Sequence, residues 1–327
     1  MADRGGYVAG IDVGGTKIRV ALVRGDGERV AARTWDTDAE RGPDAVIAAM
    51  ASGVQALVRE AGLGPGDLRV VGAGVAGPLN TLTGVASTLP NLPGWDGVPV
   101  RQRLEAAVGV PVVLGNDANV AALGEQRYGA GRGVDHMVMI TLGTGVGGGV
   151  IIDGRLLEGA VGAGGEIGHM VVSVGGAPCM CGRRGCLEAY AGGASMQRTA
   201  AAALTEPALA GSALARLTAA AGGEPSPRVL AEAADQGDPF ALDIFQQATT
   251  HLAAGIVSVV HLFNPQLVLF GGGLVALRSR FIDPAAELAV RSVFPLHAQG
   301  LRFGYAELGE DMGALGAAAL AMDRMPR

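Results

Sequence analysis

The stretch YVAGIDVGGTKIRVALV, residues 7–23, has two β-rich arms on either side of the glycine pair Gly14-Gly15. Such a pattern predicts a strand, a tight turn and a second strand. Residues 137–154, MVMITLGTGVGGGVIIDG, repeat the pattern around a second glycine-rich centre. A weak internal repeat of this kind predicts two related α/β halves, each of which opens with a glycine-bent hairpin.

Alternating helices and strands are expected around these hairpins. The expected elements are helices at residues 43–60, 98–108 and 118–128, strands at 68–75, 111–114 and 266–270, and a long helix between Asp238-Pro239 and Asn264-Pro265. Residues 200–227 are rich in Ala and Gly and predict helices and loops without clear bounds. This alternation is typical of an α/β fold.

The composition narrows the class of protein. At 327 residues the chain is long enough for two domains. Hydrophobic residues make up 49% and charged residues 17%, which is ordinary for a folded soluble protein and argues against disorder. The net charge is -6 and no basic stripe stands out, which argues against a nucleic-acid partner.

Membrane insertion and secretion are also unexpected. No apolar run approaches the ~18 residues of a transmembrane helix. The N-terminal segment meets Asp3 too early for a signal peptide. The three cysteines are an odd number, which a disulfide framework would not leave. We therefore expect a cytoplasmic protein without a membrane partner.

The glycine-rich segment Gly143–Gly148, GTGVGG, satisfies the expression GxGxxG. A dinucleotide-binding fingerprint must open a helix, whereas the following GVIIDG is a β-branched run, so this interpretation fails. Glycines between two strands can instead point backbone N–H groups at a phosphate. A single such hairpin favours a plain turn without a ligand, whereas two of them favour phosphate binding. The first hairpin adds Asp12 and the pair Thr16-Lys17, which can meet a magnesium ion and phosphate oxygens.

Residues 115–117, Gly-Asn-Asp, directly follow a predicted buried strand. The carboxyl ends of strands face the ligand crevice in α/β folds. An aspartate there can accept a hydroxyl proton, and Asn116 can hydrogen-bond a polyol. The alternative is that Asp117 only caps the helix at Ala118, and this motif alone supports the cap at least as well as the base.

All three cysteines, Cys179, Cys181 and Cys186, lie within eight residues, downstream of His169. Three thiols and one imidazole form a four-ligand set that suits structural Zn²⁺. A redox pair would more usually have the spacing CxxC, and surface thiols without a role would not gather in this way.

Two glutamates accompany these predicted ligands. Glu166 precedes His169 by three residues and Glu188 follows Cys186 by two. A zinc-bound loop would also position these carboxylates, which with an imidazole nitrogen can accept bonds from neighbouring sugar hydroxyls. The simpler alternative is that each glutamate is a solvated loop charge.

The whole pattern resembles the ROK family of sugar kinases and related repressors, within the sugar kinase, actin and heat-shock ATPase superfamily. The likeness covers nearly the whole chain, and the cysteine-rich segment is its most specific part. The matching segments are GIDVGGTK at the start, LPNLPGW at 89–95, NDANVAALGE at 116–125, TLGTGVGGG at 141–149, EIGHM at 166–170, CMCGRRGCLE at 179–188, LVLFGGG at 267–273 and LGEDMGALGAA at 308–318.

The resemblance implies a two-domain, ribonuclease-H-like (actin-like ATPase) α/β fold with the active site in the interdomain cleft. Asp117 matches the catalytic base that takes the proton of the sugar 6-hydroxyl. Asn116, Glu166, His169 and Glu188 match sugar-contacting positions. The implied zinc ligands are His169, Cys179, Cys181 and Cys186.

The resemblance also implies positions that bind ATP with Mg²⁺. The two hairpins match phosphate loops and a third glycine segment matches the adenosine contact. These positions are Asp12, Gly14, Gly15, Thr16, Lys17, Gly143, Thr144, Gly145, Gly271, Gly272 and Gly273. The implied domains are 1–117 with a C-terminal helix at about 314–327, and 118–313 with the zinc-binding loop, in a homodimer or homotetramer.

The predicted function is an ATP:hexose 6-phosphotransferase of the glucokinase type, which makes glucose 6-phosphate. Kinases for N-acetylmannosamine, fructose or mannose stay open, because one pocket contact can decide the sugar. Polyphosphate also stays open as the phosphoryl donor. A non-catalytic sugar-binding repressor is less expected, because its helix-turn-helix domain would precede a first strand that begins near Tyr7.

Overall fold

The computed structural model describes residues 6–64, 66–87, 89 and 92–325. Contacts group the chain into two compact units. The first unit comprises Met1–Met137, Gly149–Gly165 and Ala306–Arg327, and the second comprises Val138–Gly148 and Glu166–Tyr305. The division expected from the sequence, with a boundary after Asp117, differs from this grouping and stays a prediction.

The first unit holds a mixed five-stranded sheet in the order β3-β2-β1-β4-β7. Its strands are β3 (Arg29–Asp36), β2 (Lys17–Arg24), β1 (Tyr7–Val13), β4 (Leu68–Val75) and β7 (Val112–Asn116). β1 pairs antiparallel with β2 and parallel with β4, and β4 pairs parallel with β7. The predicted hairpin at residues 7–23 is therefore confirmed.

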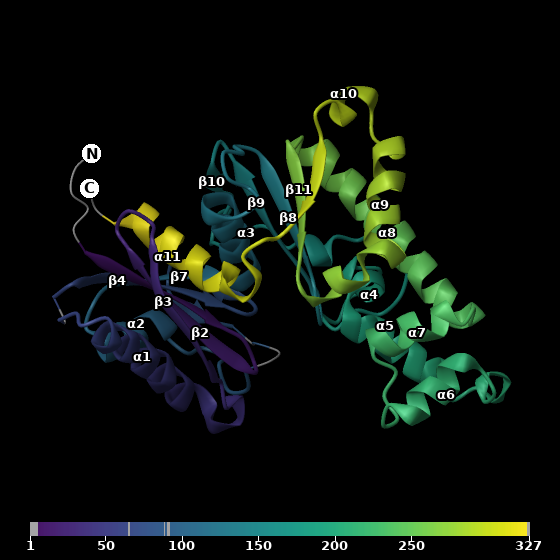
Figure 1. Cartoon of the computed structure of the whole chain (residues 1–327), viewed down its shortest axis with the longest axis horizontal. Helices are drawn as coiled ribbons and strands as arrows, with labels where there is room; N and C mark the ends of the chain where they lie inside the picture. The colour runs from purple at the N-terminus through teal and green to yellow at the C-terminus, as the bar shows by residue number, and fades with distance from the viewer. Residues whose placement is uncertain (1–5, 65, 88, 90–91, 326–327) are drawn as a thin grey trace. The chain divides into compact units, whose positions relative to one another are not determined.

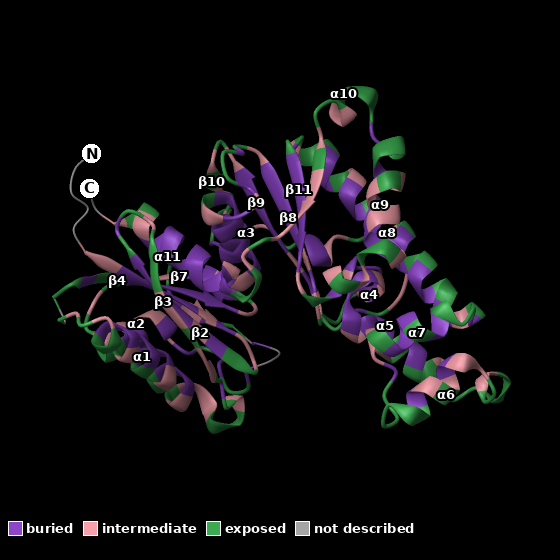
Figure 2. Ribbon diagram, in the orientation of Figure 1, coloured by how far each residue is buried: buried purple, intermediate pink, exposed green. Residues whose placement is uncertain are grey.

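Helices cover both faces of this sheet (Figure 1). On one face, α1 (Gly42–Glu60) and α2 (Val100–Val108) bury an apolar stripe against alternate residues of β1, namely Ala9, Ile11 and Val13. Figure 2 shows the opposite side of α1 exposed, as expected of an amphipathic helix. The other residues of β1, beginning with Val8, face α11 (Met312–Arg324).

Glycines bring α11 unusually close to its neighbours. A Cβ added to Gly10 of β1 would lie 1.9 Å from the carbonyl oxygen of Ala314, and one added to Gly72 would lie 1.8 Å from that of Ala317. On its other side α11 crosses α3 (Asp117–Tyr128), where a Cβ on Gly316 would lie 1.7 Å from the carbonyl oxygen of Val120. Because these neighbours are backbone atoms, only glycine fits at such contacts.

A second five-stranded sheet has the order β10-β9-β8-β11-β12. Its strands are β10 (Arg155–Leu156), β9 (Val146–Ile152), β8 (Met137–Leu142), β11 (Leu267–Gly271) and β12 (Arg302–Tyr305). In both sheets the third, second, first, fourth and fifth strands along the chain lie in that order. The repeat expected from the two glycine-rich hairpins is thus also a repeat of topology.

The second unit is otherwise helical. Its helices are α4 (Glu188–Ala191), α5 (Gly193–Ala203), α6 (Ala213–Ala220), α7 (Pro227–Asp235), α8 (Pro239–Phe263), α9 (Arg278–Ser292) and α10 (Pro295–Ala298). The long helix α8 begins as predicted, because the Asp238 side chain accepts hydrogen bonds from the N–H groups of Phe240 and Ala241. It ends at Asn264, which adopts a left-handed conformation.

Short elements complete the described chain. They are the paired strands β5 (Leu79–Asn80) and β6 (Val85–Ala86), and the 3₁₀ helices η1 (Ala39–Arg41), η2 (Ile167–His169), η3 (Pro207–Leu209), η4 (Gly273–Leu277) and η5 (Gly309–Asp311).

Expected and observed helix and strand bounds differ by one or two residues. The expected helix at 98–108 begins only at Val100. The reason is Pro99, whose ring disfavours a helical conformation of the preceding Val98. Similarly, β7 runs two residues beyond the expected Leu114, to Asn116.

Candidate functional site

Two acidic residues lie at one edge of the first sheet. Asp12 of β1 pairs with Gly74 of β4, which pairs in turn with Gly115 of β7. These three strands are parallel, so their carboxyl ends meet at the same edge. α3 begins there with Asp117, directly after β7. Gly74 allows β4 to pack closely against α3, since a Cβ on it would lie 2.5 Å from the Cγ2 atom of Val120.

Asn116, and not Asp117, caps α3. Its side-chain Oδ1 accepts hydrogen bonds from the N–H groups of Ala118, at 3.0 Å, and Asn119, at 3.2 Å. Asn116 has an extended backbone and Asp117 is the first helical residue. The alternative interpretation of Asp117 as a cap is therefore wrong, and its side chain belongs to the first turn of the helix.

The pKa of Asp12 is raised to about 7, first because the carboxyl is buried and next because Asp117 lies near it. Arg19 opposes this increase in pKa. The carboxylate also packs against the first turn of α11, where a Cβ on Gly313 would lie 2.3 Å from Asp12 Oδ2. The sequence did not indicate Arg19 or Gly313 as neighbours of this acid, because both contacts depend on the fold.

The turn of the first hairpin is supported by its own sheet. Gly14 donates its N–H to the carbonyl of Lys17 at 3.0 Å. Thr37 donates its hydroxyl to the carbonyl of Gly14 at 2.8 Å and its N–H to the carbonyl of Thr16 at 2.9 Å. Thr16 and Lys17 are exposed and Gly15 is half-buried. This turn thus presents the two polar side chains of the predicted phosphate loop to solvent.

The turn of the second hairpin is supported by helices. Gly143 bonds to the carbonyl of Gly145, and the N–H groups of Gly193 and Ala194 bond to the carbonyls of Gly143 and Thr144, each at 2.9 Å. Val146 donates its N–H to Glu188 Oε2 at 3.0 Å. Thr144 is exposed. The helices α4 and α5 therefore hold this turn, an arrangement that the sequence did not indicate.

The third glycine segment follows β11. Gly272 has a φ of 87°, and a Cβ on it would lie 2.3 Å from the carbonyl oxygen of Leu142. Packing on β8 therefore requires this glycine without any ligand. Gly271 ends the strand, and Gly273 is exposed with open space around its Cα. Of the three, Gly273 is the position where backbone is accessible.

The four predicted metal ligands come together in the second unit. One ligand atom from each of His169, Cys179, Cys181 and Cys186 lies within 4.8 Å of all the others. The Sγ atoms of Cys181 and Cys186 are 3.7 Å apart, and Cys179 Sγ lies 3.9 Å from His169 Nδ1. Two sulfurs about 2.3 Å from one tetrahedral Zn²⁺ would lie about 3.8 Å apart, so the sulfur spacing fits zinc.

Backbone geometry builds this loop. Gly182 and Gly185 have φ values of 82° and 78°, and a Cβ on Gly185 would lie 1.7 Å from the carbonyl oxygen of Ser173. Burial raises the pKa of the Cys179 thiol to about 12. Because thiols lose their protons when they bind a metal, affinity for the metal should fall as the pH falls.

The two predicted glutamates have different surroundings. Glu166 is exposed, with Oε2 3.9 Å from His169 Nε2. His169 thus turns one ring nitrogen toward the cysteines and the other toward Glu166. Glu188 is half-buried, and its Oε1 lies 3.4 Å from Cys179 Sγ while Oε2 accepts the Val146 N–H. Glu188 therefore connects the cysteine cluster to the second hairpin.

The structure leaves the predicted residues in two groups, one in each unit. Asp12, Asn116, Asp117 and the first turn belong to the first unit, and the cluster, both glutamates and the two other glycine segments belong to the second. Pro90 and Asn91 of the LPNLPGW segment lie outside the described residues.

Known proteins resemble this chain along nearly its whole length. The model of the "ROK family" matches residues 8–324. The chain belongs to the ROK family. It is 37% identical to a glucokinase of Thermotoga maritima, over 97% of each protein. It also matches the crystal structure of a ROK glucokinase from Streptomyces griseus in complex with glucose and AMPPNP, with a TM-score of 0.77, 34% identity and coverage of 97% of this chain and 100% of that one.

The same family includes proteins of another class. This ROK chain is 25% identical to a xylose repressor of Caldicellulosiruptor bescii, over 98% of this chain and 79% of the repressor. The predictions of an α/β two-domain fold and of ROK membership are confirmed. The comparisons support a ROK sugar kinase.

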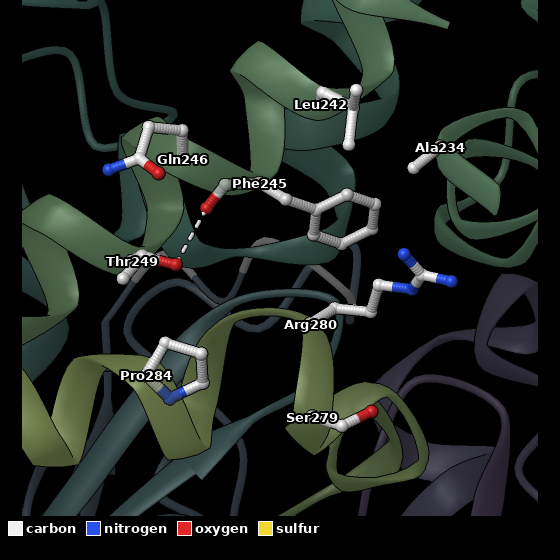
Figure 3. Close-up of a pocket in the computed structure, with 8 residues that line it drawn as sticks. All are labelled: Ala234, Leu242, Phe245, Gln246, Thr249, Ser279, Arg280 and Pro284. Carbon is white, nitrogen blue, oxygen red and sulfur yellow. Dashed lines mark hydrogen bonds between the residues drawn. The ribbon is translucent and has the colours of Figure 1, made fainter. Parts of the chain in front are cut away.

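A separate cavity of about 400 Å³ lies among α7, α8 and α9 of this ROK chain (Figure 3). Phe245 and Thr249 of α8 and Arg280 of α9 are among its lining residues, and Arg280 is paired with Asp235. It contains none of the predicted site residues. In the part of the chain that the structure describes, no helix is both long enough and apolar enough to span a membrane.

Proposed function

We propose that this chain transfers the γ-phosphoryl group of ATP to the 6-hydroxyl of glucose. The observation that carries the proposal is Asp117, which begins α3 at the carboxyl edge of three parallel strands and lies near Asp12. The likeness to glucokinases along nearly the whole chain supports the same activity.

Asp117 is the proposed general base. It stands in the first turn of α3, and its carboxylate would accept the proton of the attacking hydroxyl. The Oδ1 atom of Asn116 is occupied by the helix cap, so its amide nitrogen is the group that remains for the sugar. Glu166, His169 and Glu188 are the other proposed sugar contacts.

The phosphates and adenosine are assigned to the glycine segments. In this proposal Thr16 and Lys17 of the first turn and Thr144 of the second meet phosphate oxygens, and the accessible backbone at Gly273 meets adenosine. Mg²⁺, when bound, would neutralise charge that develops on the phosphoryl group. Asp12 would hold the waters of this ion, a task that suits a partly buried acid next to a phosphate loop.

Zinc is the proposed ion for the four-ligand cluster. Three thiols and one imidazole at the observed spacing form a closed tetrahedral set, so the ion would be structural. Its proposed effect on the sugar is indirect, because the cluster lies beside Glu188 and includes His169.

The decisive experiment is a panel of sugars and phosphoryl donors with the purified protein. We expect glucose with Mg-ATP to give the highest kcat/KM among glucose, mannose, fructose and N-acetylmannosamine, and ATP to exceed polyphosphate. A tenfold preference for N-acetylmannosamine would show that the chain is another ROK kinase and not a glucokinase.

The role of Asp117 is tested by substitution. Asp117→Asn should lower kcat by ~10²–10⁴ with sugar affinity nearly unchanged, and near-normal turnover would show that Asp117 is not the base.

A sugar-binding regulator is the second candidate, favoured by the likeness to a xylose repressor. The same panel separates the two, because a regulator would bind a sugar without turnover of any donor. Gel-filtration with light scattering would test the homodimer or homotetramer that the family resemblance implies.

A further inference from the structure

The chain passes between its two units at four places, which are Met137/Val138, Gly148/Gly149, Gly165/Glu166 and Tyr305/Ala306. At or near each connection, residues of the first unit contact the same helix, α3. The contacts come from residues that share one face at helical spacing, namely Ala118, Asn119, Ala122, Glu125 and Gln126. All five are buried.

Two connections meet the middle of this face. Asn119 donates its Nδ2–H to the carbonyl of Gly164 at 2.8 Å, one residue before the connection at Gly165. A Cβ on Gly149 would lie 2.5 Å from the Cβ atom of Ala122 and 3.2 Å from the carbonyl oxygen of Ala118. The middle of β9 therefore approaches α3 as closely as a glycine allows.

The other two connections meet the end of the helix. Glu125 is fully buried, and its Oε1 accepts the N–H groups of Glu307, at 3.0 Å, and Leu308, at 2.8 Å. Its Oε2 accepts the N–H of Ala130 at 3.0 Å. Gln126 donates its side-chain N–H to the carbonyl of Val134 at 3.3 Å, shortly before the connection at Met137.

Each buried polar side chain of α3 forms a hydrogen bond with the backbone near one of the connections. Asn119, Glu125 and Gln126 are the buried polar residues of α3 among the described residues. The Oδ1 atom of Asn119 has no hydrogen-bond partner among the residues described here. A buried amide is costly to leave unpaired, so the bond to Gly164 fixes the orientation of the Asn119 side chain.

We propose that Asn119 and Glu125 are positioning residues, which tie the connections between the units to the helix that carries Asp117. Asn119 fixes the segment that leads directly to Glu166 and His169, and Glu125 fixes the segment that enters α11. Only the expected change in kcat rests on the proposed kinase activity; the contacts themselves do not.

The kinetic test uses Asn119→Ala, with Arg127→Ala as the matched control. Arg127 lies on the same helix and pairs with Asp323 of α11 at 2.8 Å, away from every connection. We expect Asn119→Ala to lower kcat with glucose and Mg-ATP by ~10–100-fold, with glucose KM changed by less than about threefold, because small misplacements of reacting groups are costly. The control should keep both constants. Unchanged kcat in Asn119→Ala, or an equal loss in the control, would overturn the proposal.

A second variant keeps the inference testable if Asn119→Ala does not fold. Glu125→Gln has the same shape but can present only one acceptor oxygen to three N–H groups. Hydrogen exchange should then accelerate at Ala130, Glu307 or Leu308 relative to wild type and the Arg127→Ala control. Unchanged exchange at all three amides would show that Glu125 does not hold these segments.

The two readouts separate this inference from the proposed function. A wild-type protein without turnover on any sugar would remove the kinase assignment, while the exchange experiment would still decide whether α3 holds the connections. A working kinase in which both variants behave as wild type would retain the assignment and remove the positioning role.

Discussion

The two glycine-rich hairpins share a sequence pattern and a place in their sheets, yet they are supported differently. The turn between β1 and β2 is held by its own sheet, through Thr37, and has the acid Asp12 one residue before the end of β1. At the corresponding position of β8 stands Thr141. The second turn is held from outside, by α4, α5 and Glu188. The same backbone pattern therefore forms two different turns. The first has an acid beside it and is held by its own sheet, and the second has none at that position and is held by helices.

This difference separates the proposed tasks of the hairpins. Asp12 and Lys17 give the first turn groups that can meet a metal and a phosphate. The second turn offers mainly backbone, and its shape depends on a carboxylate that also faces Cys179. Changes in the cysteine cluster should consequently reach the second turn and spare the first.

The largest expected effect is loss of the metal. Cys181→Ser should remove about one Zn²⁺ per chain, because three ligands do not close a structural site. Structural zinc contributes about 10–16 kcal/mol in small zinc domains, so the loop 169–186 should lose order. Elemental analysis gives the zinc content, and hydrogen exchange should accelerate at Val146 while the amide of Gly14 stays protected.

Met180→Ser is the matched control, since Met180 lies between two ligands and is exposed. It should keep its zinc. Normal exchange at Val146 in a zinc-free Cys181→Ser protein would break the link between the cluster and the second turn.

The next effect concerns the charge of the first hairpin. Asp12→Asn should lower kcat by ~10–100-fold, the usual cost of a residue that orients a metal's ligands. Raising Mg²⁺ should recover part of the loss. Asp26→Asn, a change to an exposed aspartate between β2 and β3, should leave kcat unaltered. If Asp12→Asn kept its kcat at limiting Mg²⁺, Asp12 would have no role in binding the metal, and this difference between the two hairpins would be removed.

A pair of glycine substitutions tests the support of each turn. A Cβ on Gly145 would lie 2.4 Å from Glu188 Oε2, whereas one on Gly14 would meet only the carbonyl oxygen of Lys17, at 3.7 Å. Gly145→Ala should therefore lower the free energy of unfolding by ~1–3 kcal/mol more than Gly14→Ala. Urea denaturation of the ligand-free proteins measures both. Equal costs would mean that Glu188 moves aside freely and does not support the turn.

The last effect is a pH dependence of stability. The pKa of Asp12 is raised from 3.8 to about 7, so the folded protein holds this proton more tightly than the unfolded chain does. The resulting stabilisation is complete below pH about 4 and is lost as the pH rises through about 7. Asp12→Asn cannot ionise, so its stability relative to wild type should increase between these pH values. Denaturation midpoints without added Mg²⁺ give the difference, and the opposite slope would contradict it.

Local patterns explain why much of the fold could be predicted. The strands of both hairpins, α1, β4 and α8 have strong periodicity or clear caps, and these are properties of neighbouring residues. The cysteine cluster was equally visible, because Cys179, Cys181 and Cys186 are close in sequence. His169 needs only a short loop to join them.

Contacts between distant segments could not be predicted in the same way. Nothing near Glu188 in the sequence indicates a bond to Val146, and nothing near Asn119 indicates one to Gly164. Whether Asn116 or Asp117 caps α3 also depended on where β7 ends, two residues later than its apolar run suggests. Tertiary geometry decides such questions, and sequence patterns report mainly on local geometry.

The order of synthesis gives the close packing of α11 a further consequence. The sheet of the first unit and α3 are made early, but the helix that fits against Gly10, Gly72 and Gly124 is made last among the described helices. Until it leaves the ribosome, Val8 and Val70 lack the cover that Ala314 and Ala318 of this helix provide. The first unit should therefore complete its folding only once α11 has left the ribosome, and until then it should be a substrate for chaperones that bind exposed apolar strands.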